Sequence, residues 1–409
     1  MYQRYAQDVV KTALQDTPAV VVVGPRQCGK TTLIKGFASD QNWSYVTLDD
    51  LNQLQFAKDD PVGFVRSFRS RHIIIDEIQR VPELMLPLKQ AIDEDRQPGR
   101  YLLSGSANAM ALPKVADSLA GRLEVVNLYP LSQSEVLGKP PSFLTKLLAG
   151  ELPMTSRTRV RDELLQWVCQ GGFPEVLGRS SEARKMAWFQ QYMTSLVQKD
   201  LVDIADIEHL NLMPKLIQIL ANQAAQLVNY SQISEALQIP RQTVKRYMGL
   251  LKQLFVFQEL PAWHGNENKR LVKTPKVHMV DTGLACGVRR INAARLAEDR
   301  ALFGHLLENY IFCELQKMAS WSEEPLYFYH YRDKDKVEVD IVIETALGDV
   351  IAIEVKSGAT ITPADFKGLE RLRDVVGDRF KMGILLYDGD HSNQLSDRIC
   401  LAPLGVVWE

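Results

Sequence analysis

The sequence lacks an excess of charge of either sign and contains no long hydrophobic run. A formal net charge of −2 excludes a uniformly basic protein, so any contact with nucleic acid must come from local patches. No stretch reaches the roughly 18 apolar residues that a membrane span requires. The amphipathic amino-terminal segment carries acidic as well as basic side chains, unlike a secretory signal. We therefore expect a cytoplasmic protein without a membrane partner.

Cysteine is also scarce. The five cysteines show no spacing typical of a metal site or a disulfide framework, which fits a reducing cytosol. They are Cys28, Cys169, Cys286, Cys313 and Cys400. Detectable repeats and low-complexity tracts are missing as well, and the composition is that of a globular protein. A chain of 409 residues is too long for one compact core, so we expect roughly two to four domains.

Residues 19–33, AVVVVGPRQCGKTTL, are the most informative stretch. An apolar strand pattern leads directly into GxxxxGK[ST], and a helical pattern follows, which together predict a phosphate-binding loop. Its glycines let backbone N–H groups surround phosphates at a helix amino terminus. Lys30 is predicted to reach the β- and γ-phosphates of ATP, and Thr31 to offer its hydroxyl to Mg²⁺. The predicted nucleotide-binding residues are Gly24, Pro25, Arg26, Gln27, Cys28, Gly29, Lys30, Thr31 and Thr32.

Four further strand candidates alternate with helical patterns, which predicts an α/β sheet covered on both faces. They span residues 44–48, 72–76, 100–104 and 124–128. The run HIIID is typical of a buried parallel strand, and Asp76 and Glu77 follow at its carboxyl end, where such sheets bind ligands. We expect Asp76 to hold Mg²⁺ and Glu77 to polarise the attacking water.

The next strand candidate ends in the polar sequence SGSAN, residues 104–108. Either Ser106 or Asn108 is expected to lie beside the γ-phosphate, where it would orient water or sense hydrolysis. The alternative is a simple turn at the end of the strand.

These features occur in the order of an AAA-type ATPase. Together with SLAGR (118–122) and LYPLS (128–132), they resemble a large bacterial and archaeal AAA-type family that carries a carboxy-terminal domain of unknown function. The resemblance implies an ATPase domain over residues 1–145. In AAA-type relatives an arginine after the polar-ended strand can reach a neighbouring subunit's nucleotide. Arg122 is the candidate, which implies a homo-oligomer, either a dimer or a ring; a salt bridge within the domain is the alternative.

The middle of the chain reads as helical, with a linker or lid over residues 146–212. Its segment GGFPE, residues 171–175, resembles a motif of the same family and is expected to form a tight turn. Residues 184–204 are expected to form one amphipathic helix.

Residues 213–265 resemble a winged helix-turn-helix. A helix precedes SQISEALQI, whose Ser231 is the expected N-cap; Pro240 makes the turn, and an amphipathic helix and a strand follow. The resemblance implies that the second helix of the motif enters the DNA major groove. The alternative is a protein–protein module. The cations expected to contact DNA are Arg241, Lys245, Arg246 and Lys252.

The last segment, residues 266–409, carries a helix over 304–318 and strands over 326–332, 338–344 and 350–356. Treating the last two strands as a hairpin around the loop TALGD places Asp340 opposite Glu354. Lys356 lies two residues beyond Glu354 and shares its face. Because opposed like charges destabilise a strand pair, we expect a bound divalent metal there.

This arrangement resembles the PD-(D/E)XK nuclease core, with Val339 in place of the superfamily's proline. The resemblance implies that Asp340 and Glu354 hold Mg²⁺, that Lys356 orients or activates water, and that Glu308 is an additional acidic ligand. The alternative is a degenerate module that binds branched or single-stranded DNA or a protein. Aromatic residues of the 326–332 strand could stack on bases or pack in the core.

The fold class is therefore expected to be α/β: an AAA-type P-loop domain, a helical and winged-helix middle, and a nuclease-like α/β domain. The predicted function is a Mg²⁺-dependent ATPase that acts on DNA by translocation, junction remodelling or licensed cleavage. The alternatives are a nucleotide switch that recruits protein partners and an ATP-regulated defence nuclease.

Overall fold

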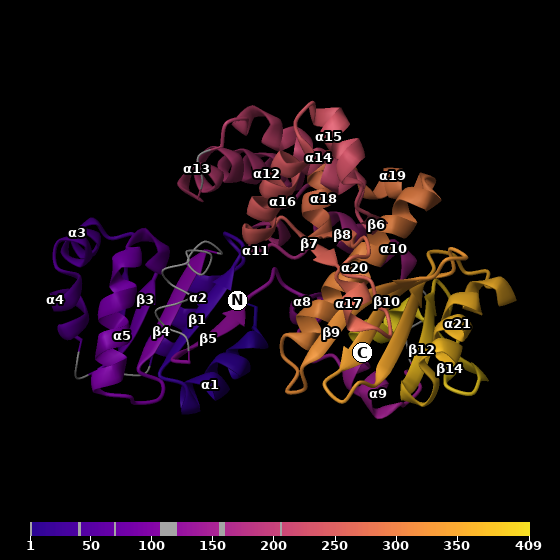
Figure 1. Ribbon diagram of the computed structural model, residues 1–409, viewed down its shortest axis with the longest axis horizontal. Coiled ribbons are helices and arrows are strands. Elements are labelled where there is room, and N and C mark those ends of the chain that lie inside the picture. The colour runs from indigo at the N-terminus through magenta and orange to yellow at the C-terminus, as the bar shows by residue number, and fades with distance from the viewer. Residues whose placement is uncertain (1, 40–41, 69–70, 107–120, 155–159, 205–206) are drawn as a thin grey trace.

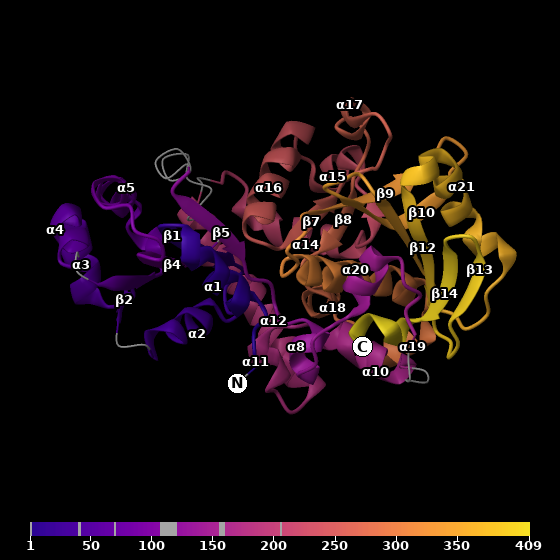
Figure 2. The same ribbon diagram turned by 90° about the horizontal axis from the view of Figure 1, so that it is seen from below.

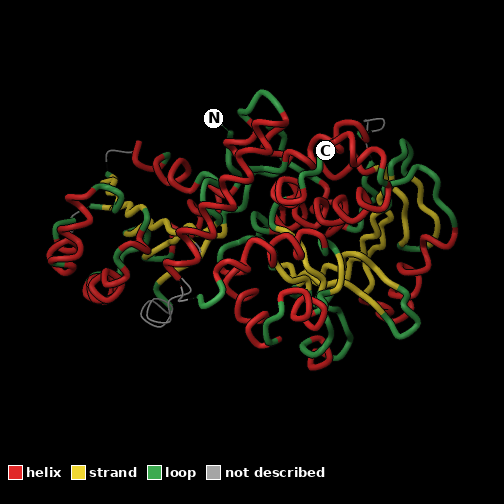
Figure 3. Tube along the Cα trace, turned by 90° about the horizontal axis from the view of Figure 1, so that it is seen from above, coloured by secondary structure: helices red, strands yellow, loops and turns green. Residues whose placement is uncertain are grey.

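Two sheets lie at opposite ends of the molecule, with a helical region between them (Figure 1). The computed structural model describes residues 2–39, 42–68, 71–106, 121–154, 160–204 and 207–409. Figure 3 shows the same division, with strands towards the two ends and mostly helices between them. Within these residues, no helix is both long and apolar enough to cross a membrane.

The amino-terminal sheet is all parallel, in the order β2-β3-β4-β1-β5. Its strands are β1 (Ala19–Gly24), β2 (Trp43–Thr47), β3 (His72–Asp76), β4 (Tyr101–Ser106) and β5 (Leu123–Asn127). Alternate side chains of β1 enter two different cores, as expected for a strand buried on both faces. The predicted α/β sheet is confirmed, with strand ends within two residues of those expected.

Helices cover both faces of this sheet (Figure 2). On one face lie α1 (Ala6–Asp16) and α2 (Lys30–Lys35). On the other lie α3 (Leu51–Asp59), α4 (Pro61–Arg66) and α5 (Met85–Glu94). Because all five strands run the same way, their carboxyl ends meet at one edge, where the loop before α2 begins.

The middle is built from helices and one small sheet. The helices are α8 (Gln133–Leu137), α9 (Phe143–Ala149), α10 (Arg161–Gln170), α11 (Pro174–Leu177), α12 (Glu182–Ser195), α13 (Leu201–Ile204), α14 (Met213–Asn222), α15 (Tyr230–Leu237), α16 (Arg241–Gln253), α17 (Glu267–Arg270), α18 (Thr282–Arg289) and α19 (Ala293–Glu298). The sheet has the order β6-β8-β7, with β6 (Gln226–Leu227), β7 (Phe257–Leu260) and β8 (Lys276–Met279) all antiparallel. It therefore crosses the domain boundary expected near residue 266.

Of two local expectations for the middle, one is confirmed with a modification and the other is wrong. The helix expected over 184–204 is present, and its turns at Leu196–Asp200 are π-helical. The N-cap of α15 is Asn229, whose side chain accepts from Gln232 N at 3.0 Å, and Ser231 lies inside the helix. Asn and Ser are about equally good caps, so the pairing of β6 with β8 just upstream decides where the helix begins.

The GGFPE turn has a specific steric reason. Gly171 has a φ of +64°, and a Cβ there would lie 2.1 Å from an Asp281 carboxylate oxygen. A Cβ on Gly172 would lie 2.0 Å from the Leu131 carbonyl oxygen. Asp281 accepts from Gly172 N at 2.7 Å, so the turn joins the amino-terminal domain to α18. The expected structural turn is confirmed.

The carboxy-terminal sheet is mixed, in the order β13-β14-β12-β11-β10-β9. Its strands are β9 (Leu326–Arg332), β10 (Glu338–Thr345), β11 (Val350–Val355), β12 (Phe380–Tyr387), β13 (Asn393–Ser396) and β14 (Ile399–Pro403). In the β10–β11 hairpin, Ile341 pairs with Ile353, one step from the predicted pair of Asp340 and Glu354, so the expected register is confirmed. The helices α20 (Arg300–Ala319) and α21 (Lys367–Val376) cover its two faces.

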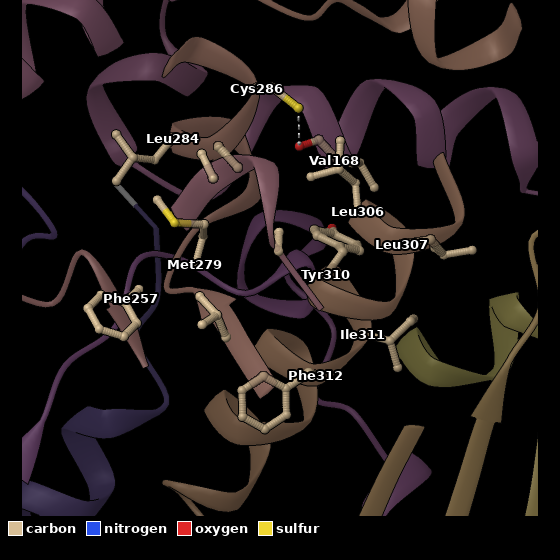
Figure 4. Close-up of a cluster of buried hydrophobic side chains, with 14 of the residues drawn as sticks. Val168, Phe257, Met279, Leu284, Cys286, Leu306, Leu307, Tyr310, Ile311 and Phe312 are labelled. Carbon is tan, nitrogen blue, oxygen red and sulfur yellow. Dashed lines mark hydrogen bonds between the residues drawn. The ribbon is translucent and has the colours of Figure 1, made fainter. Parts of the chain in front are cut away.

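Helix α20 is buried along most of its length and joins the middle to the last sheet. Side chains from several of its faces, including Leu306, Tyr310 and Phe312, enter one core shared with α10 and α18 (Figure 4). A helix that is apolar on all sides is typical of a core position. Residues placed on α20 are therefore held rigidly relative to both neighbours.

Candidate functional sites

The loop between β1 and α2 depends on two glycines. A Cβ on Gly24 would lie 2.1 Å from the Leu128 carbonyl oxygen, and Gly29 has a φ of +102°. Lys30 follows at the start of α2 and is 6% exposed. Its ammonium donates to the carbonyl oxygens of Gly24 at 3.0 Å and Pro25 at 2.7 Å. The lysine is thus folded onto neutral acceptors, which an anionic phosphate can replace.

Asp76, at the end of β3, accepts hydrogen bonds from three hydroxyl groups. Thr31 Oγ1 and Tyr45 OH each donate to Oδ2 at 2.9 Å, and Ser104 Oγ donates to Oδ1. Burial and the bond to Asp76 raise the pKa of the Tyr45 phenol. The carboxylate of Asp76 and the hydroxyl of Thr31 are hard oxygen ligands of the kind that Mg²⁺ takes. Tyr45 and Ser104 were not predicted as partners; their positions on the strands flanking β3 are the only signal.

Glu77 lies immediately beyond this cluster, with a left-handed backbone at φ +60°. Its backbone N donates to Ser104 Oγ at 3.3 Å, and its carboxylate accepts from Gln79. Gln79 in turn accepts from Ser106 N at 3.2 Å, which connects the ends of β3 and β4. The candidate Asn108 lies outside the described residues. Backbone strain of this kind is concentrated at functional sites.

Lys30, Thr31 and Glu77 line a cleft of about 1330 Å³. One wall comes from the helical middle, where Trp188 and Tyr192 of α12 stack with ring centroids 5.1 Å apart. Leu250 and Gln253 of α16 also reach the cleft, so the candidate winged helix borders it. The residues of the amino-terminal domain that line it are Arg26, Gln27, Gly29, Lys30, Thr31, Thr32, Asp49, Glu77, Gln79, Arg80, Pro82 and Ser106.

Two arginines hold the loop from outside. Arg26 pairs with Asp200 of the π-helical turn at 2.6 Å, which ties the loop to the helical middle. Arg4 donates to the Cys28 carbonyl oxygen at 2.7 Å and pairs with Glu135 at 2.9 Å. Neither Arg4 nor Asp200 was expected from the sequence, because each meets the loop across a long sequence separation.

Arg122 lies at the other edge of the sheet from the loop. It precedes β5, and its carbonyl oxygen accepts from Ala19 N at the start of β1. Its guanidinium binds Asp93 of α5 through Nε at 2.6 Å and Nη2 at 3.1 Å. The salt bridge within the domain, one of the two expected alternatives, is present. A role towards a neighbouring subunit stays a prediction.

The second candidate site is a cleft of about 820 Å³ at one end of the last sheet. It brings together all four predicted residues: Glu308 of α20, Asp340 of β10, and Glu354 and Lys356 at the end of β11. Lys356 donates to Glu354 at 2.8 Å, and Asp340 accepts from Val355 N at 3.0 Å. A register shift between β10 and β9 occurs at Asp340; such bulges re-aim side chains.

Lys276 of β8 also enters this cleft, which the sequence did not predict. Its ammonium lies 2.6 Å from Glu308 and 3.3 Å from Asp340. Burial, followed by Asp340, raises the pKa of Glu308 well above its usual range. The same two causes raise the pKa of Glu354 to about 8. Among the described residues, no group of three or more His, Cys, Asp or Glu side chains is arranged to hold a metal ion.

The predicted DNA-binding cations lie beside a third space, a groove of about 1580 Å³ between the middle and the last sheet. Arg241 and Lys245 of α16 lie over the Tyr230 ring, 5.7 and 5.3 Å from its centroid. Lys252 pairs with Glu259 at 3.0 Å and also lines the groove. Arg246 lies over the Tyr247 ring and does not line it.

The aromatic strand β9 faces this groove with alternate residues. Tyr327 and Tyr329 line it, whereas Tyr331 and Phe328 pack in or against the two cores of the last sheet. Arg270 lies over the Tyr329 ring at 4.8 Å and pairs with Glu344. Core packing, one of the two expected alternatives, is present for Phe328 and Tyr331, and stacking on bases stays a prediction for Tyr327 and Tyr329.

Three family models match the chain. Residues 16–137 match an AAA domain, and two domains of unknown function match residues 161–295 (DUF8612) and 303–407 (DUF4143). An uncharacterized protein of Mycobacterium tuberculosis is 27% identical over 401 residues, which cover 98% of this chain and 83% of that protein. One of Haemophilus influenzae is 24% identical over 380 residues, with 86% of each chain covered.

Solved structures are similar at low identity. The Walker-type ATPase of Pyrococcus abyssi has a TM-score of 0.44 and 15% identity, covering 71% of this chain and 96% of that one. AMPPCP-bound DnaA from Aquifex aeolicus has a TM-score of 0.29 and 16% identity, covering 60% and 86%. The family match spans β1, the glycine loop and the Asp76 cluster. Residues 16–137 are therefore similar in sequence to an AAA domain, and they carry the loop and the cluster described above.

Proposed function

We propose that this chain is a Mg²⁺-dependent ATPase. The observation that carries the proposal is the hydrogen bond of 2.9 Å between Thr31 and Asp76, beside a buried Lys30 that bonds only neutral carbonyl oxygens among the described residues. Lys30 would turn from these carbonyls to the β- and γ-phosphates, and the loop amides would bind their oxygens. Thr31 and Asp76 would hold Mg²⁺, which neutralises developing charge when bound. Glu77 would accept a proton from the attacking water.

The helical middle is proposed to respond to the nucleotide. It supplies one wall of the cleft and ties Arg26 to Asp200, so a phosphate that attracts Arg26 would compete with this ion pair. Hydrolysis would then change the position of the helical middle relative to the loop. An assembly in which Arg122 serves a neighbour's nucleotide is part of this proposal.

We further propose that DNA is the substrate on which the ATPase acts. The order of α14, α15, α16, β7 and β8 supports a winged-helix interpretation of the middle. The groove beside it combines cations with tyrosines, the two chemistries that single-stranded nucleic acid requires. Arg241 and Lys245 have no ion-pair partner among the described residues and would neutralise phosphates.

The last cleft is proposed as a nuclease-like site. Glu308, Asp340 and Glu354 would supply oxygen ligands for a divalent cation, and Lys356 would orient water. The convergence of four predicted residues on one cleft supports this assignment. Cleavage itself is proposed only as a licensed step, because Lys276 is also held in the cleft.

The test is ATP turnover with Mg²⁺, with and without single-stranded, duplex and four-way-junction DNA whose strands are end-labelled. We expect turnover that depends on Mg²⁺ and rises several-fold with one form of DNA. Turnover that no DNA changes would contradict the DNA proposal and favour a nucleotide switch that recruits proteins. Metal-dependent nicking that is lost in Asp340→Ala would favour the defence nuclease.

A further inference from the structure

Lys276 stands out because it is a cation placed where a metal ion is expected. It comes from β8, in the small sheet of the helical middle, and not from the last domain's sheet. Its side chain is about as buried as the carboxylates around it, with 4% of the residue exposed. The ammonium contacts Glu308 at 2.6 Å and Asp340 at 3.3 Å, on two different elements of the last domain. Lys276 therefore bridges the two regions.

The charges in the cleft show why a cation is needed. Glu308, Asp340 and Glu354 place three carboxyl groups in one largely buried space. Carboxylates so placed cannot all ionise without a counter-charge. Lys356 supplies one positive charge and pairs with Glu354. Lys276 supplies a second positive charge and pairs with Glu308 and Asp340. With both lysines in place, the cleft is held together without a metal.

The cleft nevertheless keeps an unused acceptor. Glu354 is 8% exposed, and its Oε2 has no hydrogen-bond partner among the described residues, while Oε1 binds Lys356. A buried carboxylate oxygen without a donor is costly unless a cation or water completes it. This oxygen is a coordination position that the two lysines leave open.

We propose that Lys276 is an internal lock: its ammonium occupies the place of a divalent cation, which Glu308, Asp340 and Glu354 bind only after the Lys276 side chain leaves the cleft. This inference rests on the proposed nuclease-like site and specifies its regulation. The two carboxylates lie around the ammonium at N–O distances of 2.6 and 3.3 Å, and the longer of the two exceeds the roughly 2.0–2.6 Å of Mg²⁺ or Ca²⁺ ligands.

The experiment titrates Mn²⁺ into the full-length protein without nucleotide and follows the melting temperature and the heat of binding. The variants are wild type, Lys276→Met, Lys276→Arg and the double variant K276M/E354Q. We expect Lys276→Met to melt lower than wild type without metal and to bind Mn²⁺ at least about tenfold more tightly. Lys276→Arg keeps the charge and should remain as weak as wild type. K276M/E354Q should lose the gained affinity, which places the metal in this cleft.

The outcomes distinguish the proposed lock by Lys276 from the proposed metal site of the carboxylates. Equal Mn²⁺ affinity in wild type and Lys276→Met, both weakened by Glu354→Gln, would overturn the lock and leave the metal site. No binding that depends on Glu354 in any variant would overturn both. If Lys276→Met fails to fold, Lys276→Gln asks the same question, since it removes the positive charge, keeps a polar side chain and leaves all three carboxylates in place. An unchanged affinity in that folded variant would also overturn the lock.

Discussion

Lys30 and Lys276 are both buried lysines beside clefts, and their surroundings differ in one respect. Lys30 donates to two neutral backbone carbonyl oxygens, whereas Lys276 contacts two carboxylates. The first ammonium therefore has no carboxylate partner within the described part of the chain and is ready for an anion. The second is already neutralised, and its carboxylate partners raise its pKa even though burial opposes this. The partner, and not the residue type or its burial, decides whether a buried lysine binds a ligand or replaces one.

The largest expected effect is on stability, in Lys276→Ala. Removing one partner of a buried ion pair leaves uncompensated carboxylates and costs about 3–5 kcal/mol. We expect the free energy of unfolding to fall by about that amount, measured by thermal and denaturant unfolding. Lys30→Ala is the matched control, because its lysine bonds only neutral acceptors and its loss should leave the melting temperature nearly unchanged. Equal losses in the two variants would contradict the comparison.

For ATP turnover, we expect the loss of Lys30 to have the larger effect of the two lysines. Lys30→Ala should lower kcat by at least about 100-fold, as removal of one preorganised donor to developing charge does. Lys35→Ala, an exposed lysine on the same helix, is the control and should retain turnover. Steady-state phosphate release is the measurement. Undiminished hydrolysis in Lys30→Ala would refute the assignment of the nucleotide site.

A third test measures stability as a function of pH. It concerns His330, which contacts the segment just before the strand that carries Lys276. Burial lowers the pKa of His330 to about 4, and its Nε2 lies 3.1 Å from the Thr274 carbonyl oxygen. Because the folded-state pKa is below the unfolded value of about 6.5, stability should fall as pH drops from about 6.5 to 4, by at most about 3 kcal/mol. His330→Gln should flatten this part of the melting temperature profile. A profile of wild-type shape in that variant would assign the pH dependence to other groups.

The smallest expected effect concerns an exposed cation. Lys245→Ala should weaken binding of a single-stranded oligonucleotide about threefold to tenfold and reduce the slope of log affinity against log salt by about 1. Fluorescence anisotropy at several salt concentrations measures both. Lys58→Ala, exposed on α3, is the control. An unchanged salt slope in Lys245→Ala would remove this lysine from the phosphate contacts.

Local spacing predicted much of the fold and of both sites. The loop at residues 24–31 and the carboxylates after β3 depend on residues adjacent in the chain. The β10–β11 hairpin follows from a short loop and a period of two, so the register of Asp340 and Glu354 could be predicted. Each of these features is set within about fifteen residues of sequence.

What could not be predicted depends on contacts between distant segments. Asp200 lies in the π-helical turn that follows α12, and it meets Arg26 from outside the loop's own domain. Lys276 meets Glu308 and Asp340 because β8 joins a sheet that no spacing indicated. Its one local signal is a charged residue that begins the apolar strand KVHM.

The contacts of helix α20 determine which fragments of the chain are expected to fold. Glu308 contacts Lys276, and Glu314 on the same helix accepts from Gln133 N at 2.8 Å and from Trp408 at 2.9 Å. A fragment that follows the family boundary at 303–407 would omit all three donors. Glu308 would lose the cation that pairs with it, and Glu314 would lose both donors to Oε2 and keep only Lys317 on Oε1 among the described residues. Such a fragment is therefore expected to misfold or aggregate, and dissection should keep residues 131–409 together.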